Sequence, residues 1–590
     1  MFYEMMFATD GYKLGHGPMY RKRTTRVGSN LTPRTDKIHR RTCTTFYDGR
    51  LVWVGGQAAV QELHEAWQAS FFSQPKAVVI AEYEEFLMGY LGRDLPTSAQ
   101  MALLHDLGYL PLEFRSLPEG SLVPMGIPVL TITNTDDRFH WLTNYHETPL
   151  STTTWKTATN ATIAREYRLI CEHYTKLTGC YDAFTVSVMC HDFSMRGMSG
   201  IEDAARSGVG HLTQFIGTDT LPAIRHAKRY YDATGLIGIS VPATEHAVTS
   251  NNIISIEAEL LDGTYEFAND EQRRIFNTMN EAGEELRLIA EVMFVYILIT
   301  EIVPNGIVSN VSDTYDFWGM LSRGYKYLKD VIMRREGLGP QPGKVVVRPD
   351  SGDPVTVICG MKPVLWSSEK AEEFKDLRHF YDFMDTKIVE QFSEYDCVKI
   401  GGVFYSFMVT ERTIEVGVDP IPYEVVAGAI RTLYKIFGGT ITETGHKLLD
   451  SHIGLIYGDS ITTKRAEEIL RRLAEQGYAA ANVVFGVGSF TYQCNTRDTF
   501  GFAVKATNSV IDGKDVAIFK DPKTDSKKKS AKGRLYVAEF EFDNGERRFE
   551  LADNVTQEVE ERPENKLEVF YRNGVFLKRV TLDEIRQRSV

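Results

Sequence analysis

Short apolar runs that end in small or polar residues recur through the middle of the chain. Seven such runs cover residues 184–189, 215–216, 236–241, 307–308, 345–347, 453–457 and 483–485. Apolar runs without alternation are typical of strands buried on both faces of a parallel sheet. Helical patterns lie between several of them, as at residues 464–473. The pattern predicts an α/β fold with a (β/α)-barrel-like domain, and an open doubly wound sheet is the alternative.

The segments on either side of this region show a different pattern of apolar and polar residues. Short strand patterns occur at residues 51–54, 112–117, 121–124 and 129–133, and a helical pattern at 158–177. The tail from about residue 500 returns to strand patterns, notably at 534–542. We therefore predict a smaller α+β domain built from the N- and C-terminal segments 1–180 and 500–590.

The barrel-like domain is then expected over residues 181–499. Two stretches within it, near 248–300 and 360–435, are predicted to be insertions. The second contains a charged helical piece at 368–375 and a β-rich piece at 398–418.

Composition and charge narrow the classes of function. The chain has 590 residues, with 66 Lys and Arg against 79 Asp and Glu, so its formal net charge is −13. An acidic chain argues against non-specific nucleic-acid binding. The seven cysteines form no C-x-x-C pair, the start has no signal-peptide pattern, and the most apolar stretch, 292–300, is shorter than the roughly 20 residues that span a bilayer. We expect a cytoplasmic protein without a membrane segment.

Acidic and basic side chains gather at the predicted strand ends. They are Asp219, Glu245, His246, Asp313, Arg348, Asp350 and Asp459, with Arg196 a little further along. A single carboxylate at such a position could be a helix N-cap. Several on the same rim fit a site that holds a polyanion with its divalent cation and bonds sugar hydroxyls.

Two further features point to phosphate. Gly486-Val487-Gly488-Ser489 follows the last predicted strand, where barrels often bind phosphate, although a short glycine loop is also an ordinary tight turn. Basic residues cluster toward the C-terminus, and either a solvated loop or phosphate binding explains them. They are Arg497, Lys505, Lys520, Lys528 and Arg534.

Other familiar chemistries lack their motifs. The sequence has no G-x-S-x-G elbow, H-E-x-x-H helix or G-x-x-x-x-G-K-[ST] loop. No lysine occupies a predicted strand end, which argues against a Schiff-base aldolase. Histidines and cysteines do not cluster at zinc spacing, so a structural zinc site is not expected.

A series of short motifs runs in order along residues 8–535. They are ATDGYK (8–13), LPEG (117–120), NTD (134–136), HDF (191–193), GTDT (217–220), SVPATEH (240–246), VSD (311–313), RPDSG (348–352), GD (458–459), TRD (496–498), FKDP (519–522) and KGRL (532–535). In this combination the chain resembles the nicotinamide phosphoribosyltransferases, type II phosphoribosyltransferases of NAD salvage. The resemblance is broken mainly by the two predicted insertions.

The resemblance implies an enzyme that forms nicotinamide mononucleotide and pyrophosphate from nicotinamide and phosphoribosyl pyrophosphate. It further implies Mg²⁺, ATP hydrolysis coupled through a phosphohistidine at His246, and a homodimer with active sites at the subunit interface. Three alternatives stay open: a nicotinate phosphoribosyltransferase of the same fold, a non-catalytic nucleotide-binding relative, and an unrelated phosphate-binding barrel enzyme.

The resemblance also assigns roles to matched positions. The catalytic positions are His246, Asp219, Asp313 and Asp350, and the candidates for Mg²⁺ are Glu245, Asp313 and Asp350. The substrate-binding positions are Tyr12, Phe193, Arg34, Arg196, Asp219, Ser240, Ser309, Arg348, Gly458, Asp459, Gly488, Ser489, Arg497, Lys505, Lys520 and Lys528. Phe193 and the partner subunit's Tyr12 are expected to enclose the pyridine ring, and Asp219 to accept a hydrogen bond from its carboxamide.

Overall fold

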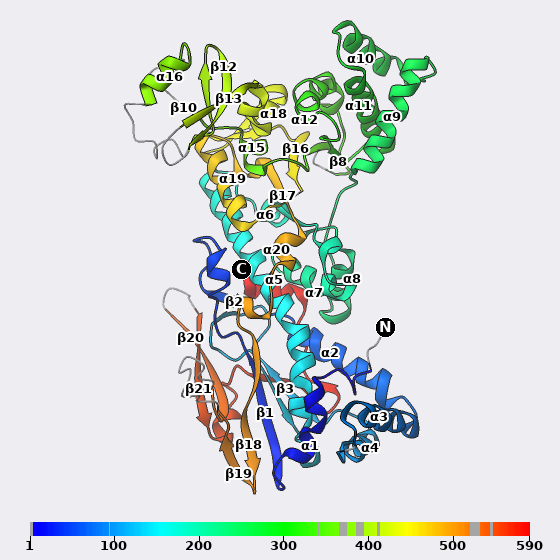
Figure 1. The fold of residues 1–590 in the computed structure, drawn as a ribbon, viewed down its shortest axis with the longest axis vertical. Coiled ribbons are helices and arrows are strands. Elements are labelled where there is room, and N and C mark those ends of the chain that lie inside the picture. The colour runs from blue at the N-terminus through cyan, green and yellow to red at the C-terminus, as the bar shows by residue number, and fades with distance from the viewer. Residues whose placement is uncertain are drawn as a thin grey trace. The chain divides into compact units, whose positions relative to one another are not determined.

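The computed structural model describes residues 4–93, 95–339, 342–364, 374–384, 395–409, 414–458, 460–519, 531–542 and 547–590. The chain divides into two compact units, coloured by residue number in Figure 1. Unit 1 comprises Met1–Arg168, Ser194–Gly238 and Ser489–Val590, and unit 2 comprises Leu169–Phe193 and Ile239–Gly488. Both ends of the chain therefore belong to unit 1.

Unit 1 is built on a seven-stranded sheet in the order β19-β18-β1-β5-β3-β22-β23. The strands are β1 (Thr24–Thr32), β3 (Leu112–Ser116), β5 (Leu130–Asn134), β18 (Ala503–Ile511), β19 (Lys514–Ala517), β22 (Glu568–Arg572) and β23 (Val575–Phe576). All neighbouring pairs are antiparallel. In β5, buried residues alternate with half-buried ones, as expected of a strand with only one face in a core. The strand predictions near 112–117 and 129–133 are confirmed.

Shorter pairs and helices complete unit 1. The predicted strands at 51–54 and 121–124 are β2 (Arg50–Val52) and β4 (Leu122–Pro124), which pair with each other. The strand predicted at 534–542 is β20 (Arg534–Glu541), which forms a hairpin with β21 (Arg547–Val555). The principal helices are α2 (Gly56–Trp67), α3 (Lys76–Leu91), α4 (Thr97–Leu107), α7 (Ile201–Leu212), α8 (Leu221–Tyr230) and α22 (Leu582–Ser589). The helix predicted at 158–177 is the second half of α5 (Leu142–Leu177), which continues through Pro149 and contributes to both units.

Unit 2 contains a parallel sheet in the order β6-β17-β16-β9-β8. The strands are β6 (Cys190–Asp192), β17 (Val483–Val487), β16 (Ile453–Tyr457), β9 (Lys344–Arg348) and β8 (Ile307–Val311). A parallel bridge between Ala243 and Ser309 extends the sheet beyond β8. Unit 2 is thus a mixed α/β unit with a parallel half-barrel sheet.

Two predicted strands differ from the structure. The run at 184–189 is helical, as α6 (Ala183–Val188), and its strand begins only at Cys190. The Asp182 side chain accepts a hydrogen bond from the Thr185 N–H at 2.8 Å, so an N-cap starts a helix where apolarity alone indicated a strand. The run at 236–241 has a single bridge position, Ile239, and is followed by the bridge at Ala243. The run at 215–216 lies beside the short β7 (Gly217–Thr218) of unit 1.

The two predicted insertions have their own elements in unit 2. Three helices, α9 (His246–Asp262), α10 (Asp270–Glu281) and α11 (Leu286–Ile297), follow one another in the first. The second contains a four-stranded sheet of β10 (Pro363–Val364), β11 (Cys397–Ile400), β12 (Val403–Val409) and β13 (Ile414–Ile421). The β-rich prediction at 398–418 is confirmed, whereas most of the piece predicted as helical at 368–375 lies outside the described residues. Across the described chain, no helix is both long and apolar enough to cross a membrane.

Candidate active site

The carboxyl ends of the central strands in unit 2 meet around the ring of Phe193. A Cβ atom built on Gly486, in β17, would lie 2.5 Å from Phe193 Cδ2. A Cβ atom built on Gly458, just after β16, would lie 2.8 Å from Asp350 Oδ1. A side chain at Gly486 would collide with the Phe193 ring, and one at Gly458 would displace the Asp350 carboxylate. The two glycines let an aromatic face and a carboxylate share one strand-end site.

The loop after β9 is fixed by its own hydrogen bonds. The Tyr457 hydroxyl donates to the carbonyl oxygens of Ser351 and Gly352 at 3.0 and 2.7 Å. Asp313 Oδ2 accepts from the Asp350 N–H at 2.8 Å and from the Ser351 hydroxyl at 2.6 Å. These contacts hold the Arg-Pro-Asp-Ser-Gly segment at the strand ends.

His246 is the first residue of α9 and faces two carboxylates. Its Nε2 lies 3.6 Å from Asp313 Oδ1 and 3.9 Å from Asp350 Oδ2, while its Nδ1 lies 3.2 Å from the Thr314 hydroxyl. The imidazole is 47% exposed and Asp313 only 3%. A buried carboxylate thus lies at ion-pair distance from a histidine that is open to reactants. A histidine in this position can serve as an acid, base or nucleophile.

Three buried polar atoms at these strand ends have no hydrogen-bond partner among the described residues. They are the Ser309 hydroxyl oxygen, Asp313 Oδ1 and Arg348 Nε. Buried polar groups are usually paired, and an unpaired one keeps the capacity to bond a ligand, an ion or a water. These atoms give the strand ends the capacity to bond a polar ligand. We call this region the strand-end site and define it as Phe193, His246, Ser309, Asp313, Arg348 and Asp350.

The remaining predicted positions of unit 2 are more exposed. Ser240 and Glu245 are both exposed, and Glu245 is the N-cap residue of α9. A Cβ atom built on Gly488 would meet nothing within 4 Å, so that position opens to space. Within the described ranges, no group of three or more His, Cys, Asp or Glu side chains is arranged to hold a metal ion.

Unit 1 carries the other predicted positions. Asp219, just after β7, is exposed, as are Arg196 and Lys505. Ser489 packs against Gly197, where an added Cβ would lie 2.2 Å from the Ser489 hydroxyl. Tyr12 is 67% exposed.

Two arginines of unit 1, and three positions outside the described residues, complete the predicted set. The Arg34 Nε donates to the Gly501 carbonyl at 3.0 Å, and Arg497 is paired with Asp498 at 3.3 Å. Asp459, Lys520 and Lys528 lie outside the described residues.

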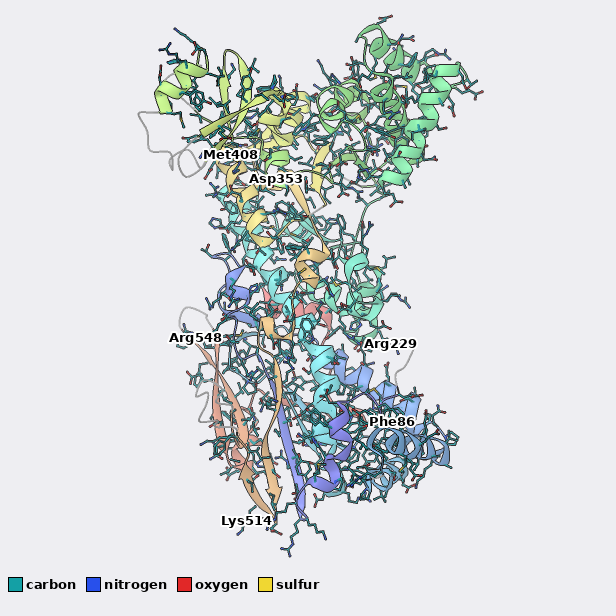
Figure 2. All side chains as sticks on the ribbon, in the orientation of Figure 1. Phe86, Arg229, Asp353, Met408, Lys514 and Arg548 are labelled. Carbon is teal, nitrogen blue, oxygen red and sulfur yellow. The ribbon has the colours of Figure 1, made fainter. Side chains whose placement is uncertain are left out.

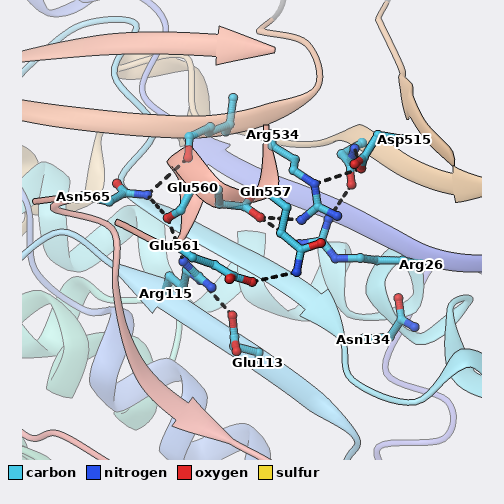
Figure 3. Close-up of polar contacts among 12 residues, drawn as sticks. Arg26, Glu113, Arg115, Asn134, Asp515, Arg534, Gln557, Glu560, Glu561 and Asn565 are labelled. Atoms are coloured by element: carbon cyan, nitrogen blue, oxygen red, sulfur yellow. Dashed lines mark hydrogen bonds and ion pairs between the residues drawn. The ribbon is translucent and has the colours of Figure 1, made fainter. Parts of the chain in front are cut away.

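Arg534 is wrong as a phosphate ligand. Its side chain is 5% exposed and pairs with Glu560 at 2.6 Å and with Asp515 at 2.8 Å. Figure 3 shows that it belongs to an arginine cluster in unit 1, made of Arg26, Arg115 and Arg534 with Glu113, Asp515 and Glu560. The charge of Arg534 is neutralised inside the protein and is not available to a substrate.

Glu291 is a residue that the motif analysis did not select. It lies in α11 and is only 2% exposed, and its Oε1 has no hydrogen-bond partner in the described part of the chain. Burial, reinforced by Asp316 and Asp313, raises the pKa of Glu291 to about 8. In the sequence, Glu291 directly precedes the most apolar stretch of the chain, 292–300. That position indicates that Glu291 is buried, but it does not indicate that Glu291 lies near Asp313.

Comparison with known proteins gives consistent results. Residues 188–563 match the model of the nicotinate phosphoribosyltransferase family. A protein of Acinetobacter baylyi named nicotinamide phosphoribosyltransferase is 41% identical over 98% of this chain and 96% of its own length. One of the same name from Mycoplasma pneumoniae is 27% identical over 90% and 95%.

A solved structure supports the fold alone. The crystal structure of human nicotinic acid phosphoribosyltransferase has a TM-score of 0.54 at 15% sequence identity, covering 100% of this chain and 93% of that one. At that identity the match supports the architecture described above and not the choice of substrate.

Proposed function

Since the chain belongs to the nicotinate phosphoribosyltransferase family, we propose that it makes nicotinamide mononucleotide in NAD salvage. Its substrates are nicotinamide and phosphoribosyl pyrophosphate: a bond forms between the pyridine nitrogen and C1 of the ribose, and the bond from C1 to pyrophosphate breaks. The observation that carries the proposal is 41% identity, along 98% of the chain, to a relative named for this activity.

The strand-end site supports the chemistry of the transfer. Breaking the bond at C1 develops positive charge on the ribose and negative charge on the leaving pyrophosphate, so fixed charges of both signs are needed. Phe193 offers a face for the pyridine ring. Arg348, whose Nε is unpaired, is assigned to the phosphates, and Asp350 with Gly458 to the ribose hydroxyls.

Phosphate recognition is assigned to a glycine loop and to a set of cationic positions. Gly488 and Ser489 would receive the 5′-phosphate through backbone N–H groups. The cationic positions proposed for the phosphates and pyrophosphate are Arg34, Arg196, Arg497, Lys505, Lys520 and Lys528.

His246 is the proposed acceptor of a phosphoryl group from ATP. Asp313, 3.6 Å from its Nε2, is suited to orient the ring and to stabilise its cationic form. Hydrolysis of the phosphohistidine would be coupled to nucleotide formation without being required for it. ATP is thus a co-substrate in this proposal.

Mg²⁺ is the proposed metal, and its two strongest candidate ligands fit what the ion prefers. Mg²⁺ usually takes one or two carboxylates and completes its shell with water and substrate phosphates. Asp350 is 37% exposed and Asp313 has one oxygen without a hydrogen-bond partner in the described structure. When bound, the ion would neutralise the pyrophosphate. Glu245 stays a third candidate.

A homodimer follows from the proposed role of Tyr12. Tyr12 is 67% exposed, and in this proposal its ring enters the pyridine site of a second copy of the chain. Arg497 and Lys505, also in unit 1, are assigned to the partner's site in the same way. The domain boundaries and the cytoplasmic location remain predictions.

Product formation tests the proposal. Purified protein with phosphoribosyl pyrophosphate and Mg²⁺ is given nicotinamide or nicotinate, each with and without ATP. Nicotinamide mononucleotide should form preferentially, and ATP should increase its yield. His246→Asn, as a matched control, should retain the ATP-independent rate and lose the stimulation. Preference for nicotinate would favour the nicotinate enzyme, and ligand binding without product would favour the non-catalytic relative.

Asp219 is the proposed source of the preference for nicotinamide. A carboxylate accepts a hydrogen bond from an amide N–H and repels the carboxylate of nicotinate. Asp219→Ser should therefore lower kcat/KM for nicotinamide and narrow the gap between the two bases. Unchanged kcat/KM for both bases would remove Asp219 from the specificity argument.

A further inference from the structure

The segment that carries Tyr12 is attached to α5 by a buried ion pair. It consists of a 3-10 helix, Gly11–Gly15, followed by α1 (His16–Met19). Lys13 is 5% exposed, and its ammonium group donates to Glu147 Oε2 at 2.9 Å and to the Asn144 carbonyl at 2.7 Å. A lysine is almost never so deeply buried unless it is paired, so this residue has a specific partner on α5.

Glu147 is in turn fully engaged. Its Oε1 accepts from the Ser29 hydroxyl at 2.8 Å and from the Asn144 side-chain amide at 3.1 Å. The carboxylate is therefore held from β1 and from α5 before it meets Lys13. A second tie comes from the next residue of α5, where the Thr148 hydroxyl donates to Asp10 Oδ2 at 2.5 Å.

The backbone of the segment is pressed against α3 and α4 as well. A Cβ atom built on Gly11 would lie 2.2 Å from the Tyr90 hydroxyl, and one built on Gly17 would lie 2.0 Å from Gln100 Oε1. Tyr90 stacks on Phe86 of α3 with ring centroids 5.7 Å apart, and Phe86 is labelled in Figure 2. The backbone of the segment thus lies close against the ends of the Tyr90 and Gln100 side chains.

Tyr12 itself makes few contacts. Its ring is 67% exposed and meets the His16 ring with centroids 5.4 Å apart. Neighbouring residues thus fix the backbone on both sides of Tyr12 and leave its side chain outside. Exposing an aromatic ring on a rigid base lowers the conformational entropy lost when that ring binds a partner.

We propose that the buried Lys13–Glu147 ion pair is the positioning device for Tyr12, setting the ring for the nicotinamide site of a second subunit. This inference rests on the proposed function, because it assumes that Tyr12 touches the substrate. Lys13 and Glu147 do not touch substrate themselves and act through the Tyr12 backbone.

Lys13→Met and Glu147→Gln each break the pair with little change in volume. Either variant should raise the KM for nicotinamide about tenfold, with a smaller change in kcat, because displacing a substrate-contacting group by about 1 Å is costly. The double variant Lys13→Met/Glu147→Gln leaves no unpaired charge and should regain part of the lost affinity. Arg534→Met is the matched control, since the Arg534–Glu560 pair has nearly the same burial, 5% and 13% against 5% and 14%, but lies outside the Tyr12 segment.

Hydrogen–deuterium exchange provides a readout that does not depend on activity. Lys13→Met should speed exchange in the peptide covering residues 10–17, whereas Arg534→Met should leave that peptide unchanged. Faster exchange in a protein that makes no nucleotide would show that the ion pair orders the segment, but it would overturn the proposed function and with it the role of Tyr12 at a nicotinamide site. An active enzyme whose exchange and nicotinamide KM are both unaltered by Lys13→Met would overturn the positioning device alone. A rise in KM equal to that of Arg534→Met would also overturn it, because the effect would then be general destabilisation.

Discussion

The strand-end site of unit 2 and the arginine cluster of unit 1 are both dense in charge, yet they differ in how that charge is satisfied. In the arginine cluster, Arg534 pairs with two carboxylates and Arg115 with Glu113 at 2.7 Å. In the strand-end site, Ser309, Asp313 and Arg348 each keep a buried atom that has no hydrogen-bond partner in the described chain. A satisfied cluster stabilises the fold, whereas an unsatisfied one keeps bonding capacity for a ligand.

The largest expected effect comes from removing an unpaired charge of the strand-end site. Arg348→Ala should lower kcat/KM about 10³-fold, because in the proposed function this side chain donates to the negative charge that develops on the phosphates. Its free energy of unfolding should change by less than about 1 kcal/mol, because no described residue pairs with the Nε. Steady-state kinetics and urea unfolding measure the two quantities. A large loss of stability with activity retained would place Arg348 in the same class as Arg534.

The converse substitution in the arginine cluster should affect stability instead. Arg534→Ala leaves Glu560 and Asp515 without their partner and should lower the free energy of unfolding by about 3 kcal/mol. The kcat/KM of the folded fraction should match that of the wild type, because the guanidinium is committed to internal pairs. Urea unfolding and kinetics below the transition check this. Normal stability with a raised KM for phosphoribosyl pyrophosphate would reverse the assignment.

Glu291 extends the contrast between satisfied and unsatisfied charge to a third place in the fold. It is a buried carboxyl group near Asp313, and one of its oxygens has no hydrogen-bond partner in the described structure. Its folded-state pKa of about 8 is above the 4.5 of the unfolded chain, so folding favours the protonated form. The resulting contribution to stability is complete below pH 4.5 and is lost as the pH rises toward and through 8. Between pH 5 and pH 7 the wild type should lose about 1.4 kcal/mol per pH unit from this group.

Glu291→Gln should remove that slope, since an amide does not titrate. Urea unfolding at several pH values compares the two proteins, with Glu301→Gln as a control because Glu301 is exposed at the end of the same apolar stretch. Parallel stability profiles for wild type and Glu291→Gln would show that Glu291 is ionised at neutral pH and has a partner.

The sequence was sufficient for most strands but not for the pairing of charges. Consecutive apolar residues predicted β8, β9, β16 and β17, because burial selects apolar side chains along a strand. β8, β16 and β17 are buried along most of their length, whereas buried and half-buried residues alternate in β9. Arg348 and Arg534 are the same residue type and both lie in motifs of the resemblance, and only tertiary structure brings Glu560 to one of them. The helix at 183–188 was mistaken for a strand because one capping side chain outweighed an apolar run.

The smallest expected effect comes from a single hydroxyl. Ser309 is 3% exposed, and its Oγ has no hydrogen-bond partner among the residues described. If that oxygen faces a ligand, Ser309→Ala should leave the free energy of unfolding unchanged or slightly higher, since no internal bond is broken. The KM for nicotinamide should rise roughly fivefold, the equivalent of one hydrogen bond of about 1 kcal/mol.

Thr244 provides the matched comparison for Ser309, because it is equally buried but satisfied. Its hydroxyl accepts from the Val311 N–H at 2.9 Å and donates to Asn310 at 3.3 Å. Thr244→Val should therefore lower the free energy of unfolding by about 1–2 kcal/mol, as it leaves a buried N–H unpaired. Equal stability losses in the two variants would mean that Ser309 also has an internal partner, and the contrast between the two regions would then rest on Arg348 and Asp313.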